Sequence, residues 1–141
     1  MINFEGTKNF ILNKLTKELQ PELQYHNIEH TVDVLESAER LAGLEKENGH
    51  NLLLLKTAAL FHDSGMLIRY IEHEEASTVL TRQFLPDYGY SGHDIDVINK
   101  MILTTKLPQS ARTKLEKILC DADLDYLGRD DFYMIDRKSV V

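Results

Sequence analysis

Apolar residues recur every three to four positions along most of the chain. This spacing places side chains on one face of a helix, and Pro or Gly residues mark where such stretches stop. The stretches cover residues 10–19, 28–42, 74–85, 94–103 and 111–123. Alternation of polar residues with β-branched or aromatic ones, which would indicate strands, is not sustained anywhere. The pattern therefore predicts an all-α protein.

The segment 52–61 differs from the others because it is apolar on nearly every side. It reads LLLLKTAALF, and a helix without a polar face is normally surrounded by other helices. We therefore expect it to form the centre of a compact helical bundle. No repeat, low-complexity stretch or linker rich in Pro, Gly and Ser divides the chain. Residues 1–141 are thus predicted to form a single domain.

Composition and charge narrow the class of protein. A chain of 141 residues with 43% hydrophobic residues can bury a core without disulfides. Its longest apolar run, residues 52–55, is far shorter than the roughly 18 residues of a membrane helix. The lone Cys120 and a start unlike a leader peptide favour the cytoplasm. A net charge of −7 without a basic stripe argues against long nucleic acid, but a small phosphorylated ligand stays compatible with it if a metal ion supplies positive charge.

Candidate chemistry begins directly after the apolar segment, at His62 and Asp63. A carboxylate there faces a large desolvation cost unless a cation or hydrogen-bond donor compensates it, and a metal ion would do so. The alternative is that Asp63 caps the local backbone and His62 is a hydrogen-bonded core histidine. A second His-Asp pair follows Ser91 and Gly92. The spacing of Ser91 and Asp94 is typical of a capping box, so we assign that pair to helix capping.

Two histidines upstream, His26 and His30, are four residues apart, a spacing that brings both to one face of a helix. Asn27 favours a helix cap at this point, which would put His26 before the helix and His30 one turn inside it. His30 is then the better ligand candidate, because the apolar positions that follow mark a buried face close to it.

Two carboxylates downstream, Asp121 and Asp123, interrupt an apolar stretch. Alternate positions of a helix point to different sides, so at most one of them is expected to meet His62 and Asp63. The spacing alone does not choose between the two.

A His, then His-Asp, then a distant Asp resembles the signature of the HD superfamily of metal-dependent phosphohydrolases. The segments YHNIEH with the following TVDV, AALFHDSG, HEEAS, MILTTK and CDADLDYLG resemble, in order, segments of bacterial predicted HD phosphohydrolases. The YHN with a second His four residues on, and the Ala-Asp-Leu near the end, are also similar to cyclic nucleotide phosphodiesterases. The bacterial predicted HD phosphohydrolases continue for further helices beyond this segment, so we expect this chain to be a form shortened at its C-terminus.

The resemblance implies roles for individual residues. The implied metal ligands are His30, His62, Asp63 and Asp123, with Asp123 favoured because it occupies the Asp of the family's Ala-Asp. By the same likeness, His26 would be a general acid and His73 a ligand of a second ion. Threonines stand at 104 and 105, where branches with two or three metals place histidines. One firmly held ion is therefore expected, and Asp63 would belong to the catalytic centre as well as to the ligand set.

The expected function is hydrolysis of a small phosphorylated substrate, a nucleotide phosphomonoester or phosphodiester, by metal-activated water. Two imidazoles and two carboxylates suit Mn, Fe, Ni or Zn, or Mg, better than calcium. Ser64 and Gly65 after the His-Asp pair differ from alarmone hydrolases, cyclic dinucleotide phosphodiesterases and eukaryotic cyclic nucleotide enzymes, so none of those activities transfers.

Lys106 follows the two threonines and is expected to contact a substrate phosphate, unless it is a solvated residue near a helix C-terminus.

Two alternatives to an enzyme remain open at this point. One is an inactive HD domain that acts as a nucleotide-binding sensor or interaction module, and the other is a plain helical module with a structural polar cluster. The sequence leaves the oligomeric state open.

Overall fold

Helices account for nearly all of the secondary structure in the computed structural model, which describes residues 1–125 apart from the side chains of residues 25, 26 and 125. The elements are α1 (Phe4–Glu18), α2 (Pro21–Leu44), α3 (Gly49–Phe61), the 3₁₀ helix η1 (Ser64–Leu67), α4 (His73–Phe84), the 3₁₀ helix η2 (Leu85–Tyr88), α5 (Gly92–Thr104) and α6 (Lys114–Asp125). No strand occurs within this range, and the all-α prediction is confirmed.

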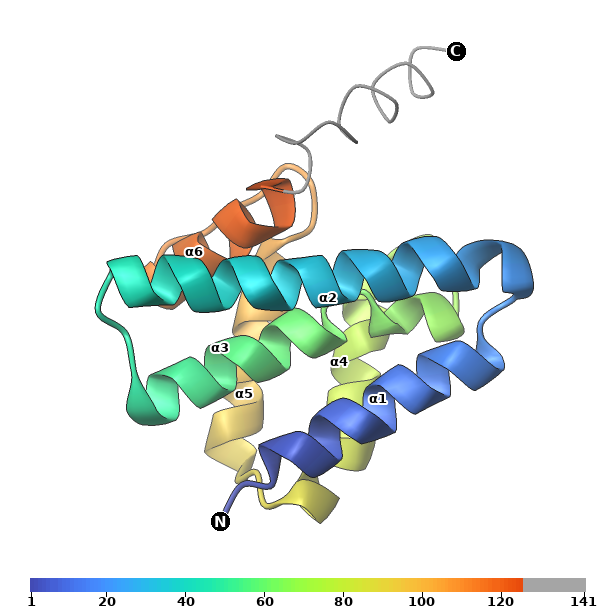
Figure 1. Cartoon of the computed structure of the whole chain (residues 1–141), viewed down its shortest axis with the longest axis horizontal. Helices are drawn as coiled ribbons and strands as arrows, with labels where there is room; N and C mark the ends of the chain where they lie inside the picture. The colour runs from blue at the N-terminus through green and yellow to red at the C-terminus, as the bar shows by residue number, and fades with distance from the viewer. Residues whose placement is uncertain (126–141) are drawn as a thin grey trace.

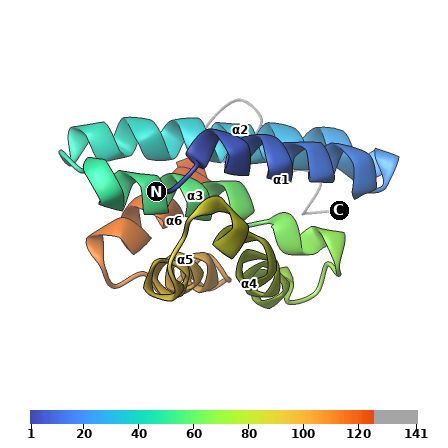
Figure 2. The ribbon, with the colours of Figure 1, turned by 90° about the horizontal axis from the view of Figure 1, so that it is seen from below.

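The helix α3 lies in the middle of the bundle. It packs against α1, α2, α5 and α6, and Figure 2 shows it between the layer of α1 and α2 and the pair formed by α4 and α5. The residues from Thr57 to Phe61 are all buried. This arrangement confirms the prediction of a central apolar helix. Figure 1 shows the long α2 crossing the whole molecule, with α6 beside its C-terminal half.

Several helix boundaries differ from the prediction: α1 begins at Phe4 rather than at residue 10, and α3 begins at Gly49 rather than at residue 52. Two further differences have a clear physical cause. The helix α2 begins at Pro21. Proline is favoured at the first helical position, because the backbone N–H that it lacks would have no partner inside the helix. Asn27 is therefore inside α2, where its Nδ2 donates to the Leu23 carbonyl at 2.8 Å. The predicted cap at Asn27 is wrong, and the backbone of His26 belongs to the helix.

The helix α6 begins at Lys114, three positions later than predicted, after a set of reciprocal bonds. The Glu116 amide donates to Thr113 Oγ1 and the Thr113 amide donates to Glu116 Oε1. The predicted capping box of α5 is confirmed, since Ser91 and Asp94 exchange bonds of the same kind. Within the described residues, no helix combines the length and the apolar character needed to cross a membrane.

A tight packing of η1 against α4 places the end of α3. The Gly65 amide donates to Ser77 Oγ at 2.7 Å, and Ser77 Oγ donates to the His62 carbonyl at 3.1 Å. A β-carbon on Gly65 would overlap the His73 carbonyl and lie 2.6 Å from the Ser77 amide nitrogen. Only glycine allows this close approach. Gly65 therefore fixes the position of the preceding segment, His62 to Ser64, against the start of α4.

We predict that Gly65→Ala lowers the free energy of unfolding by about 3 kcal/mol or more, because the added methyl group meets backbone that has no room to move. Gly43→Ala is the matched control. Gly43 lies in α2 with open space around the position of a β-carbon, so alanine there should raise the free energy of unfolding by about 0.5–1 kcal/mol. Urea unfolding of the two variants measures both values, and a Gly65→Ala protein as stable as the wild type would contradict the packing.

Candidate metal centre

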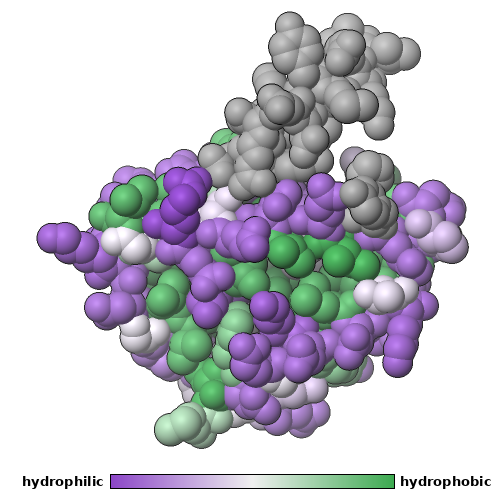
Figure 3. Space-filling view, viewed as in Figure 1, coloured by the Kyte–Doolittle hydropathy of each residue, from purple (hydrophilic) through white to green (hydrophobic). Residues whose placement is uncertain are grey.

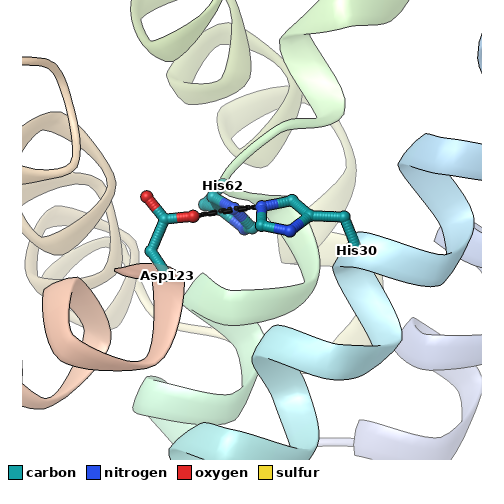
Figure 4. A group of neighbouring side chains, drawn as sticks. All are labelled: His30, His62 and Asp123. Carbon is teal, nitrogen blue, oxygen red and sulfur yellow. Dashed lines mark hydrogen bonds and ion pairs between the residues drawn. The ribbon is translucent and has the colours of Figure 1, made fainter. Parts of the chain in front are cut away.

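Three side chains from three helices meet at the end of α3 (Figure 4). The Nε2 atoms of His30 on α2 and His62 after α3 are 3.3 Å apart. The Oδ1 atom of Asp123 on α6 lies 3.0 Å from the first and 3.3 Å from the second. These three ligand atoms form a group that could hold a metal ion. Segments that are 32 and 93 residues away from His30 in sequence are thus brought to one point.

Asp63 lies beside this group of three and contacts both of its histidines. Its Oδ2 lies 3.4 Å from His30 Nε2 and 3.3 Å from His62 Nε2, and its Oδ1 accepts a hydrogen bond from His73 Nε2 at 2.9 Å. Asp63 precedes η1 but makes no capping bond to it. The alternative role of Asp63 as a local helix cap is therefore wrong.

The spacing of these donors fits a single transition-metal ion. Ligand atoms about 2.0–2.2 Å from one ion, at adjacent octahedral or at tetrahedral positions, lie roughly 2.8–3.6 Å from one another. The distances above, between 3.0 and 3.4 Å, fall in that range. In addition, His62 Nδ1 donates to the Ala59 carbonyl at 2.7 Å, which leaves Nε2 unprotonated for a ligand in the neutral ring.

Outer contacts hold two of the donors in place. The amide group of Gln109 donates to Asp123 Oδ2 at 3.3 Å, so the second oxygen of that carboxylate is engaged while the first faces the histidines. The bond from His73 does the same for Asp63. Such contacts reduce the freedom of a ligand before an ion arrives.

The electrostatics of the metal-free centre balance within the group. Burial alone would lower the pKa of His62, but the carboxylates of Asp63 and Asp123 outweigh burial and raise it to about 10. Burial would raise the pKa of both carboxyl groups, yet the imidazoles beside them hold these values below the usual range. Without an ion, a protonated imidazole therefore compensates the buried carboxylates; an ion would take over that role.

His73 lies at the first position of α4, next to the centre. Burial alone would lower its pKa, but Asp63 and Glu74 outweigh it and raise the value. Its Nε2 is 3.3 Å from Glu74 Oε2, and its Nδ1 donates to the Tyr70 carbonyl at 3.1 Å. The buried Glu74 was missed by sequence reasoning, because an acidic residue in the first turn of a helix is ordinarily explained by the helix dipole.

The other predicted residues are placed as follows. Asp121 is exposed, so of the two carboxylates on α6 the structure brings only Asp123 to the group. Lys106 is exposed, and its Nζ pairs with Glu75 Oε2 at 2.9 Å and Glu72 Oε2 at 3.8 Å. Its contact with a phosphate stays a prediction. The side chain of His26 lies outside the described residues, so its role as a general acid also stays a prediction.

A pocket of about 220 Å³ opens over the centre. It is lined by His30, Asp63, Met66, His73, Glu74, Thr105, Leu107, Asp123 and Leu124. Three of these side chains are carboxylates, so an anion that enters requires a cation on the floor of the pocket.

Comparison with known proteins agrees with this fold. The crystal structure of a predicted HD superfamily hydrolase from an uncultured Thermotogales bacterium superposes with a TM-score of 0.72 at 26% sequence identity, covering 95% of this chain and 74% of that one. An uncharacterized protein of Clostridium beijerinckii is 33% identical over 81 residues, which span 55% of this chain and 51% of that protein. This chain thus matches only about half the length of that relative.

The family comparison covers the centre itself. Residues 27–125 match the HD domain family, a range that contains the four clustered donors and begins one position after His26. With a helical fold shared with an HD superfamily hydrolase and this match over most of its length, the chain belongs to the HD domain family.

Proposed function

We propose that this protein is a metal-dependent phosphohydrolase that cleaves a small phosphorylated substrate, with a nucleotide phosphomonoester or phosphodiester as the expected substrate. One observation carries the proposal: the ligand atoms of His30, His62 and Asp123 lie 3.0–3.3 Å from one another. Asp63 Oδ2 lies 3.3–3.4 Å from both histidines, and an open pocket reaches His30, Asp63 and Asp123. An octahedral ion such as Mn²⁺ that is held by four protein donors keeps two coordination positions for water and substrate, as a catalytic site requires.

The four clustered side chains would hold the ion. A divalent ion bound there supplies Lewis acidity and makes water a better nucleophile at neutral pH. Other residues of the chain orient these ligands. His62 Nδ1 donates a hydrogen bond to the Ala59 carbonyl, and His73 Nε2 donates one to Asp63 Oδ1. His26, on the same helix as His30, is proposed to protonate the leaving oxygen. A positioned general acid typically contributes about 100- to 10,000-fold.

Lys106 is proposed to reach the substrate phosphate by exchanging partners. Its neighbours Thr105 and Leu107 line the pocket. The ion pairs that it makes with Glu75 and Glu72 are exposed, and exposed pairs contribute little because water and salt screen them. A phosphate anion would therefore compete effectively for this ammonium group.

A pair of isosteric substitutions on α6 tests the metal site. Asp123→Asn should weaken binding of Mn²⁺ at least about 100-fold, because loss of a ligand costs more than the roughly 10- to 100-fold of an outer contact. Asp121→Asn, two residues away on the exposed side, should leave affinity unchanged. Calorimetric titration of metal-free protein measures both, and equal affinity of the two variants would contradict the ligand set.

A second test concerns turnover. The double variant His62→Ala with Asp63→Ala should lose both bound metal and hydrolysis in a screen of phosphomonoesters and phosphodiesters. His93→Ala, which removes an exposed histidine, should keep both. Bound metal without turnover in the wild type would favour the sensor alternative. Absence of metal under every loading condition would show that the polar cluster is structural.

The pH dependence of metal binding follows from His62. Its folded pKa of about 10 exceeds the unfolded value of about 6.5, so its protonated form stabilises the metal-free fold fully below pH about 6.5. That stabilisation is lost as the pH rises toward about 10. An ion binds the neutral ring and displaces the proton.

We therefore expect metal affinity to rise from pH 6 to 9 while the melting temperature of the metal-free protein falls. Titrations and thermal melts at each pH, with His62→Gln as the comparison, check both trends. An affinity independent of pH would contradict them.

A further inference from the structure

Apolar side chains surround the mouth of the pocket. We define the apolar rim as Met66, Tyr70, Leu107 and Leu124. Met66, Leu107 and Leu124 line the pocket directly, and the ring centroid of Tyr70 is 6.3 Å from that of His73, which also lines it. Tyr70 and Leu107 are each 76% exposed and Leu124 is 44% exposed. Large apolar groups thus face solvent directly beside the buried acidic floor.

The rim is assembled from separate parts of the chain. Met66 belongs to η1, Tyr70 to the loop that leads into α4, Leu107 to the loop after α5, and Leu124 to the last turn of α6. Two more exposed apolar residues, Ile68 and Ile71, lie in the same loop as Tyr70. Others lie elsewhere, among them Leu23 and Leu44 at opposite ends of α2 and Val79 on α4. Figure 3 shows apolar side chains among polar ones over one face of the molecule. Scattered exposed apolar residues need no explanation, whereas several gathered around a polar pocket indicate a surface that contacts a ligand.

The size of the pocket indicates which part of a ligand meets the rim. Its volume is about 220 Å³, below the roughly 300–1,000 Å³ of pockets that enclose a whole small molecule. A phosphate group and the water around it can occupy this space, close to the four clustered donors. The group esterified to the phosphate must then extend outward past Leu107 and Leu124.

We propose, building on the phosphohydrolase function above, that the pocket binds the phosphate alone and that the apolar rim binds an apolar or aromatic group attached to it. The preferred substrates are then phosphate esters whose esterified group presents an apolar or aromatic face to the rim, a nucleobase being one such face, rather than esters whose group is polar throughout. Burial of such a face against the rim removes water from both surfaces, which favours binding.

Phosphonates test this inference without relying on turnover, because their carbon–phosphorus bond is not a hydrolysable ester. Calorimetry on the Mn²⁺-loaded protein would compare methyl-, propyl-, hexyl- and phenylphosphonate with 2,3-dihydroxypropylphosphonate. Full burial of a methylene group is worth about fourfold in affinity, and an open rim should give about half of that effect, roughly twofold per methylene. We expect hexylphosphonate to bind about eightfold more tightly than propylphosphonate. The phenyl compound, compared with the hexyl compound, distinguishes an aromatic from an alkyl preference.

A matched pair of leucines provides the control. Leu107→Ser should remove most of the gain from propyl to hexyl, whereas Leu44→Ser, at a leucine that is 70% exposed and distant in the fold, should keep it. Equal affinity for methyl- and hexylphosphonate would overturn the assignment of the rim while leaving phosphate binding intact. Failure to bind any phosphonate, together with absence of hydrolysis, would overturn the proposed function and the rim with it.

Discussion

The compensation of two partly buried carboxylates at the end of the most apolar helix is the constraint on which the rest of the structure depends. Asp63 and Asp123 lie in an environment where a lone carboxylate would be strongly disfavoured. Two imidazoles, from His30 and His62, face them at 3.0–3.4 Å. Helices α2, α3 and α6 must keep their register for these four groups to meet. The cost of separating the charges therefore links the core packing to the site.

The short segment after α3 transmits that constraint to α4. Gly65 approaches the backbone of α4 so closely that a side chain is excluded, and Ser77 bridges the Gly65 amide and the His62 carbonyl. The same contact carries His73 to Asp63. A residue pair that differs from better-known HD branches, Ser64-Gly65, thus has a structural explanation: the Ser64 hydroxyl closes the end of α3 on the Phe61 carbonyl, and Gly65 docks α4.

Much of this arrangement could be predicted from the sequence, and the failures have physical causes. Helical periodicity and the apolar segment before His62 identified the helices, the central position of α3 and the desolvated Asp63. The predicted cap at Asn27 is wrong because a proline can either end a helix or begin one. Only the packing of the folded chain shows that Pro21 begins α2. Spacing could not separate Asp121 from Asp123, since that choice depends on how α6 rotates against α2. Glu74 gave no signal, because its importance comes from a neighbour in space.

The contrast between floor and rim explains how one small pocket can be selective. Without an ion, the carboxylates of the floor are already paired with the imidazoles beside them, so the floor offers no free positive charge to an anion. In the proposed function, a phosphate binds there together with a cation. The ion and the phosphate supply affinity that is common to every phosphate ester. Discrimination among esters must then come from groups outside the floor. At the mouth, the exposed side chains of Leu107 and Leu124 stand beside the acidic residues. In the proposed function, selectivity among esters is therefore assigned to the exposed apolar residues of the rim, which are neither metal ligands nor acids.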